Sequence, residues 1–153
     1  MKKYRWILLP ILLCVSVWTL FQTVFFVGIV PSSSMEPTIP TGSVIWGLRL
    51  PKEIQKNDIV VFQHGEKALV KRVVAMAGDI VYVDDESGSF SVNAPISAAT
   101  RILKVPDGNL FVVGDNRSFS VDSRYWDDPF LDSNLVVALV FSTAKEMKTS
   151  RKE

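Results

Sequence analysis

The sequence contains few of the residues from which metal and thiol sites are built. Among its 153 residues there is one cysteine and one histidine. Cys14 is the only cysteine and lies inside a long apolar run. Without a second cysteine, neither an intramolecular disulfide nor a cysteine-rich metal site can form. A zinc site usually needs several histidine or cysteine ligands, which His64 and Cys14 cannot supply. We therefore expect no metal, and a fold held together by side-chain packing.

A large charge of one sign and phosphate-binding motifs are also lacking. The 17 basic residues nearly balance the 16 acidic ones, and the net charge of +1 gives no electrostatic reason to expect nucleic acid as a partner. No glycine-rich phosphate loop occurs, so nucleotide chemistry is not indicated and no cofactor is expected. Nothing in the composition implies an oligomer.

The N-terminal segment holds the long hydrophobic run. Residues 6–30 contain no charged side chain, and this length is sufficient to cross a bilayer. Basic residues precede the run, which favours a cytoplasmic N-terminus. A cleavable signal peptide is the alternative, but its apolar core normally has ~7 to 15 residues and ends in an Ala-x-Ala-like site, and no alanine precedes Ala68. We predict a cytoplasmic N-terminus at 1–5, a transmembrane anchor at 6–28, an extracytoplasmic domain at 29–144 and a C-terminal tail at 145–153.

Short apolar segments separated by turn residues follow the anchor and predict a mainly β domain, a compact sheet or barrel-like structure. Two linkers, 64–67 and 84–88, place glycine among polar residues, and we expect both to be solvent-facing hairpin turns. The predicted strands are 43–46, 58–63, 68–75, 79–84, 89–93, 110–113 and 135–142.

A serine hydrolase needs a base to remove the hydroxyl proton, and in the familiar triad that base is histidine. His64 is a weak candidate because it lies beside Gly65 in a predicted turn. A Ser-Lys pair is another route. The densest serine cluster, Pro31-Ser32-Ser33-Ser34-Met35-Glu36-Pro37-Thr38, follows the apolar run directly, although such a segment alone is more typical of a linker.

A candidate base lies in the predicted strand at 68–75. Strand alternation places Lys71 on one face with Leu69 and Val73, while Arg72 lies on the other. Lysine is the better base because arginine does not deprotonate usefully in proteins. Both cations could simply extend their charged ends to water. For Lys71 to act at neutral pH its pKa must fall by about three units, which requires a dry site.

A third segment, residues 114–124, reads Gly-Asp-Asn-Arg-Ser-Phe-Ser-Val-Asp-Ser-Arg directly after an apolar strand. Its composition is typical of a surface loop. Taken in order, however, the three segments resemble the boxes of the type I signal peptidase family, which uses a Ser-Lys dyad. The matching stretches are 31–38, 57–62, 71–79 and 114–124, so the resemblance covers most of the predicted outer domain.

The resemblance implies roles for individual residues. Ser34 would attack the scissile carbonyl, and Lys71 would take its proton and later protonate the leaving amine. Ser120 would orient Lys71, and the oxyanion would be held by the Ser34 backbone N–H and the Ser32 hydroxyl. Residues implied to support the site are Met35, Arg72, Gly114, Asp115, Arg117, Asp122 and Arg124. The partners implied are secretory preproteins, cleaved after small residues at positions −1 and −3, and membrane lipid.

The sequence departs from the family pattern at several positions and leaves other functions open. Ser33 and Asn57 stand where glycine is usual, and Ser118, Phe119 and Asp127 also differ, which affects the expected substrate range. Self-cleaving repressors of the SOS response share the dyad, but the anchor and the lack of a helical DNA-binding domain argue against them. The remaining alternatives are a peptidase dedicated to pilins or to a conjugation system, and a non-catalytic anchored β module.

Overall fold

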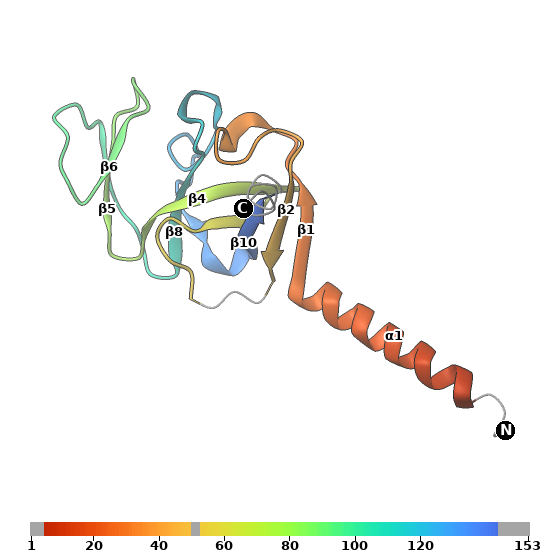
Figure 1. The fold of residues 1–153 in the computed structure, drawn as a ribbon. Helices are drawn as coiled ribbons and strands as arrows, with labels where there is room; N and C mark the ends of the chain where they lie inside the picture. The colour runs from red at the N-terminus through yellow and green to blue at the C-terminus, as the bar shows by residue number, and fades with distance from the viewer. Residues whose placement is uncertain (1–4, 50–52, 144–153) are drawn as a thin grey trace, which may run out of the picture.

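The computed structural model describes residues 5–49 and 53–143, which form one helix and two antiparallel β-sheets (Figure 1). The predicted tail at 145–153 lies outside the described residues. Helix α1 spans Arg5–Val24. The strands are β1 (Phe25–Ile29), β2 (Val44–Leu48), β3 (Ile59–His64), β4 (Lys67–Met76), β5 (Ile80–Val83), β6 (Phe90–Val92), β7 (Arg101–Lys104), β8 (Asn109–Val113), β9 (Leu131–Asp132) and β10 (Val136–Thr143). A mainly β fold with one N-terminal helix is thus confirmed.

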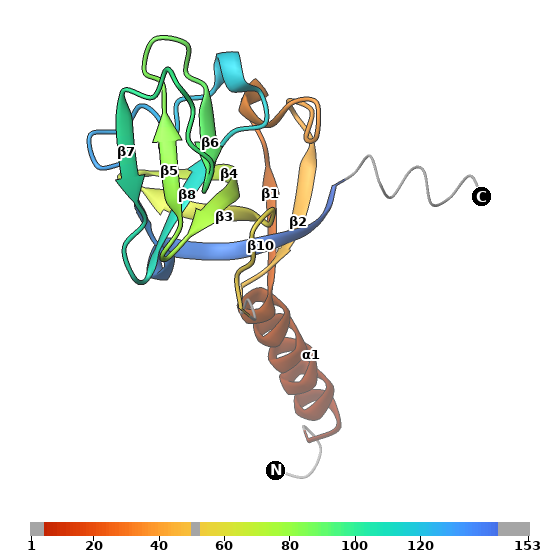
Figure 2. The same ribbon diagram turned by 90° about the vertical axis from the view of Figure 1, so that its left-hand side faces the viewer.

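The larger sheet has the strand order β1-β2-β10-β3-β4-β8-β9, and the smaller has β6-β5-β7. In Figure 2 the smaller sheet lies beside the larger one, on the side away from β1. A buried cluster joins the two sheets, because Ala75 of β4 and Phe111 of β8 pack with Val81 and Val83 of β5. This contact fixes β8, and with it the loop that follows β8.

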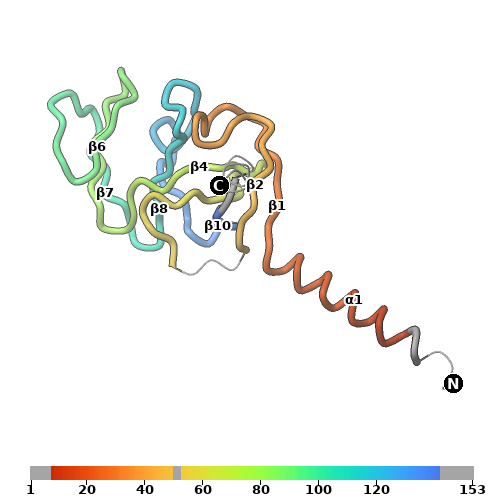
Figure 3. Tube along the Cα trace, in the orientation of Figure 1, coloured from red at the N-terminus to blue at the C-terminus, as the bar shows by residue number. Residues whose placement is uncertain are grey.

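Helix α1 extends away from the sheets, and the N-terminus lies at its far end (Figure 3). Its apolar side chains are mostly exposed, among them Leu9 at 67% and Trp18 at 64%. Within residues 5–49 and 53–143, no helix combines the length and the apolar character needed to cross a membrane.

The helix ends before the predicted end of the anchor. Residues 25–28, which the sequence analysis assigned to the anchor, lie in β1 and pair with β2 from Phe25↔Leu48 to Ile29↔Val44. Phe26 of β1 packs against the buried cluster that contains Val30 and Met35. The end of the apolar run therefore belongs to the sheet.

The two predicted hairpins are present. Gly65 has a φ of 59° in the turn between β3 and β4, and residues 84–88 connect β5 to the strand that pairs with it, β6. The second turn does not face solvent throughout, because Asp84 and Gly88 are buried. Asp84 accepts a hydrogen bond from the Ser87 hydroxyl and so closes the turn on itself.

Candidate active site

The predicted nucleophile lies in a short 3₁₀ turn, Ser33–Met35, directly after β1. Ser34 is 8% exposed, and its Oγ lies 3.3 Å from the Oγ of Ser32. Met35 is fully buried and packs with Val30, so it fixes the turn to the core. Ser33 is not among the residues with positive φ, which means that this turn does not need the glycine usual at that position.

The predicted base lies in the middle of β4. Burial alternates along this strand so that Lys71, Val73 and Ala75 point inward, and Lys71 is only 4% exposed. The neighbouring strand β3 places Val60 opposite Lys71 in the sheet register. The ammonium does not extend to water. Its Nζ donates a 2.9 Å hydrogen bond to the Oγ of Ser120, a residue 49 positions away in the sequence.

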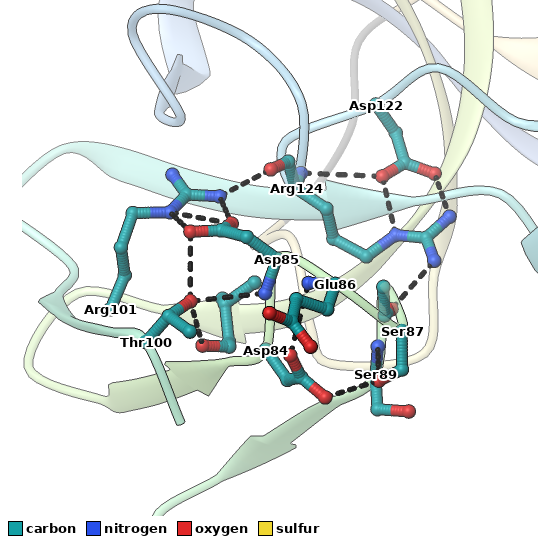
Figure 4. A network of polar contacts seen from close by, with 11 residues as sticks. Asp84, Asp85, Glu86, Ser87, Ser89, Thr100, Arg101, Asp122 and Arg124 are labelled. Carbon is teal, nitrogen blue, oxygen red and sulfur yellow. Dashed lines mark hydrogen bonds and ion pairs between the residues drawn. The ribbon is translucent and has the colours of Figure 1, made fainter. Parts of the chain in front are cut away.

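Ser120 belongs to a buried polar network with Asp122 and Arg124. Figure 4 shows the Asp122 and Arg124 side chains of this network side by side. The Ser120 hydroxyl donates to Asp122 Oδ2 at 2.6 Å. Asp122 is fully buried and pairs with Arg124, whose Nε lies 2.8 Å from Asp122 Oδ1. The Arg124 guanidinium also donates to the backbone carbonyls of Gly88 and Arg117. Charges removed from water are costly unless paired and hydrogen-bonded, and here each has its partners.

Burial and the charge of Asp122 act on the pKa of Lys71 in opposite directions. Burial lowers the pKa below the ordinary lysine value of 10.5, the charge of Asp122 partly opposes this, and Arg124 adds to it, with a net lowering. For Asp122, burial alone would raise the pKa, but hydrogen bonds from Arg124, Ser120 and the Gly114 N–H outweigh it and lower the pKa. Relative to ordinary side chains, the site thus shifts the pKa of Lys71 toward the neutral amine and that of Asp122 toward the carboxylate.

A second ion pair lies on the other side of β4. Arg72 donates to both carboxylate oxygens of Asp115, at 2.8 and 2.6 Å, and to the backbone carbonyl of Asn57. Asn57 has a φ of 76°, so the asparagine in place of the usual glycine adopts the left-handed conformation that it tolerates. Arg117, by contrast, is exposed and its guanidinium lies 4.7 Å from the centroid of the Phe90 ring.

The loop after β8 approaches the serine turn closely. A Cβ atom on Gly114 would lie 2.5 Å from the Ser34 carbonyl oxygen and closer still to Ser120 Oγ. Asn116, for which the sequence predicts no role, also contacts this turn. Asn116 donates its backbone N–H to Ser34 O at 3.0 Å and its side-chain Nδ2 to Ser33 O at 3.1 Å. Because these bonds reach backbone atoms far along the chain, no local motif reveals them.

Ser34 and Lys71 open into the same cavity, whose volume is about 510 Å³. Its walls come from β1 and the segment after it, from the first half of β4, and from the loop after β8. Phe119 and Val121 line it while remaining 75% and 70% exposed, so they form its rim. Among the hydrogen bonds of the described residues, none joins Ser34 Oγ directly to Lys71 Nζ.

His64 lies apart from this cavity. Its ring stacks on that of Trp126 at 4.3 Å between centroids, and it lines a different hollow together with Asp127 and Asp128. Within residues 5–49 and 53–143, no group of three or more His, Cys, Asp or Glu side chains could hold a metal ion.

Comparisons with known proteins agree with the residue pattern. Residues 3–100 and 91–143 match the family described as signal peptidase, peptidase S26. Signal peptidase I V of Bacillus subtilis (strain 168) is 31% identical over 166 residues, which cover 89% of this chain and 96% of that protein. Signal peptidase I of Pseudomonas fluorescens is 30% identical over 162 residues, covering 70% of this chain and 57% of that protein. This chain therefore spans little more than half of the Pseudomonas relative but almost all of the Bacillus one.

A signal peptidase I of Enterococcus faecalis V583 is similar among solved structures. It is 25% identical, covers 59% of this chain and 98% of that one, and gives a TM-score of 0.44. The family match covers most of the chain, and the Bacillus relative extends over nearly its whole length. The chain belongs to the signal peptidase family, peptidase S26, whose members are serine endopeptidases that remove signal peptides.

Proposed function

We propose that this chain is a membrane-bound serine endopeptidase that removes signal peptides from secreted preproteins after small residues at positions −1 and −3. The observation that carries the proposal is the juxtaposition of Ser34 and a buried Lys71 in one cavity. A lysine whose pKa is lowered can exist as the neutral amine that a general base requires.

In the proposed mechanism, the Ser34 hydroxyl attacks the scissile carbonyl while Lys71 Nζ accepts its proton. The tetrahedral intermediate collapses when Lys71 returns that proton to the leaving amine, which leaves an ester on Ser34. Water, deprotonated by Lys71, then hydrolyses the ester and regenerates the hydroxyl. The hydrogen bond from Lys71 to Ser120 limits the rotation of the amine and keeps it directed into the cavity.

The oxyanion is held by the Ser34 backbone N–H and the Ser32 hydroxyl. The side-chain part of this proposal is supported by the 3.3 Å separation of the two Oγ atoms, since a hydroxyl at this distance can rotate toward an oxygen bound at Ser34. Preorganised donors of this kind contribute about 3 kcal/mol each to the stabilisation of the transition state.

The substrate enters as an extended segment. Lys67–Lys71 of β4 pair with β3 on one side, whereas the pairing of β4 with β8 begins only at Arg72. The backbone edge of the first half of β4 is thus open toward the cavity, where it can pair with a substrate strand. The mainly apolar wall beside it, which includes Val70 and Val30, suits small apolar side chains.

We further propose that the N-terminal segment anchors the chain in a cell membrane in a single pass, with the N-terminus cytoplasmic and the sheets on the outer face. The exposed apolar side chains of α1 support this, because lipid would cover them. Of the predicted anchor, residues 6–28, the part up to Val24 lies in α1, and residues 25–28 belong to β1. Only the short strand β1 and the residues after it separate α1 from Ser34, which would place Ser34 near the membrane surface.

Substitution of the dyad tests the catalytic proposal. Cleavage of a model preprotein in detergent should fall to background in Ser34→Ala and in Lys71→Ala, because each removes a group that the chemistry requires. His64→Ala is the matched control and should keep full activity, since His64 lies outside the cavity. Wild-type cleavage by the Lys71 variant would refute the mechanism.

A further inference from the structure

The loop between β8 and Asp122 contacts both proposed catalytic residues. At one end Asn116 binds the backbone of the serine turn, through Nδ2 to Ser33 O and through its own N–H to Ser34 O. At the other end Ser120 accepts the hydrogen bond from Lys71 Nζ. The two parts of the chain that the loop contacts in this way, the serine turn and Lys71, are far apart in the sequence.

This loop is rigid for identifiable reasons. The Phe119 N–H donates to Asn116 O and closes the turn between Asn116 and Ser120. Asp122 Oδ2 accepts hydrogen bonds from both the Gly114 N–H and the Ser120 hydroxyl, which ties the start of the loop to its end. Because hydrogen bonds cross-link this short loop, a displacement of Asn116 would also displace Ser120, and the reverse.

We infer that Asn116 is a positioning residue that sets where Ser34 lies relative to Lys71. No hydrogen bond among the described residues joins the two side chains directly, so their separation depends on what holds each of them. Ser120 holds the lysine. Asn116 holds the serine turn through one side-chain and one backbone hydrogen bond. Substitution can remove only the side-chain bond, because the backbone N–H remains in every variant.

The inference rests on the proposed function and adds a separate role to it. The residues that line the cavity do not include Asn116, so we expect it to act through Ser34 and not by binding substrate. Loss of its side chain should therefore lower kcat and leave KM nearly unchanged. A displacement of about 1 Å in a catalytic group can reduce the rate by about 100-fold, and we expect a fall in kcat of about 10- to 100-fold.

The variants Asn116→Ala, Asn116→Asp and Asn116→Gln test this role in the full chain. Alanine removes the amide, and aspartate keeps its shape but presents a carboxylate oxygen that cannot donate to Ser33 O. Both should lower kcat. Glutamine retains the N–H donor and should recover part of the activity. The acid limb of the pH profile of kcat should not move in Asn116→Ala or Asn116→Gln, because neither substitution adds a charge near Lys71. Asn116→Asp adds a negative charge and is not used for this readout.

Asn109→Ala is the matched control, since Asn109 Nδ2 also donates to a backbone carbonyl, that of Asp107, and does not line the cavity. It should keep the wild-type kcat. The inference is overturned if Asn116→Ala and Asn116→Asp both keep the wild-type kcat, or if the acid limb shifts in Asn116→Ala. If Asn116→Ala does not fold, as judged by its melting temperature, the comparison of kcat between Asn116→Asp and Asn116→Gln decides whether the N–H donor matters. Activity in Ser34→Ala would instead refute the proposed function.

Discussion

Lys71 is the residue at which packing and chemistry conflict. An inward-facing position on β4 would ordinarily hold an apolar side chain, as Val73 and Ala75 do on the same face. Burial therefore lowers the pKa of the Lys71 amine, and the hydroxyl of Ser120 gives the amine a partner without a second charge in direct contact. In the proposed mechanism the residue can serve as a base because the fold disfavours its charged form.

The direction of this shift predicts how activity depends on pH. Lys71 acts when neutral, and its pKa is lowered, so activity should be present above the lowered pKa and be lost as pH falls through it. The acid limb of kcat/KM should lie below the ordinary lysine value of 10.5. The measurement is kcat/KM for a peptide substrate across pH.

His64 provides the control for this profile because it is the only histidine in the sequence and lies outside the cavity. The acid limb should be the same in His64→Ala as in the wild type. Its disappearance in that variant would assign the limb to the histidine and contradict the role given to Lys71.

At the scale of elements, the loop after β8 connects the two halves of the site, and Gly114 allows its close approach. Gly114→Ala should lower kcat by about 100-fold or more, because the added Cβ would overlap the Ser34 carbonyl oxygen and Ser120 together. The crowding should also cost about 1–3 kcal/mol of unfolding free energy. Activity and denaturant unfolding of the purified variant measure the two effects.

Gly108→Ala is a matched control for this substitution. Gly108 has a φ of 73° but open space where a Cβ would lie, so alanine there should cost about 1–2 kcal/mol of stability without touching the site. Its kcat should equal that of the wild type. Equal losses of activity in the two variants would mean that the effect of Gly114→Ala comes from general destabilisation.

The elements also show why sequence patterns predicted some of the fold and not the rest. β3 and β4 could be predicted because each is a mainly apolar run, rich in residues that favour strands, that ends at a polar turn. β1 was not predicted as a strand, because its five apolar residues continue the hydropathy of α1 without a break. β7 has only two apolar residues, Leu103 and the exposed Ile102, between Arg101 and Lys104, so it lacked an apolar run. β9 has only two residues.

The residues of the candidate site likewise divide into those that sequence patterns could predict and those that they could not. Ser34, Lys71 and Ser120 were identified because the residues around them form recognisable boxes. The side-chain bond from Asn116 to Ser33 spans 83 positions and ends on a backbone carbonyl, which any residue possesses. Such a contact depends on the fold and has no counterpart in composition or spacing.

At the scale of the whole molecule, the junction of α1 and β1 joins the proposed anchor to the catalytic sheet. β1 is an edge strand of the larger sheet, and it contributes Phe26, Gly28 and Ile29 to the cavity. The same segment therefore ends the apolar helix and forms one wall of the site. Separating anchor from enzyme requires a cut between Val24 and Phe25, a boundary different from the one predicted at residue 28.

Two truncations test this boundary and the anchor together. A variant that begins at Phe25 retains every pair between β1 and β2, so it should fold and cleave a peptide substrate, and it should appear in the soluble fraction. The full chain should remain with membranes after alkaline carbonate washing. A variant that begins at Val30 lacks β1 and the packing of Phe26 on the core, and it should have a lower melting temperature and a reduced kcat/KM. Release of the full chain by carbonate would contradict the anchor, and equal activity of the two truncations would contradict the role of β1 in the cavity.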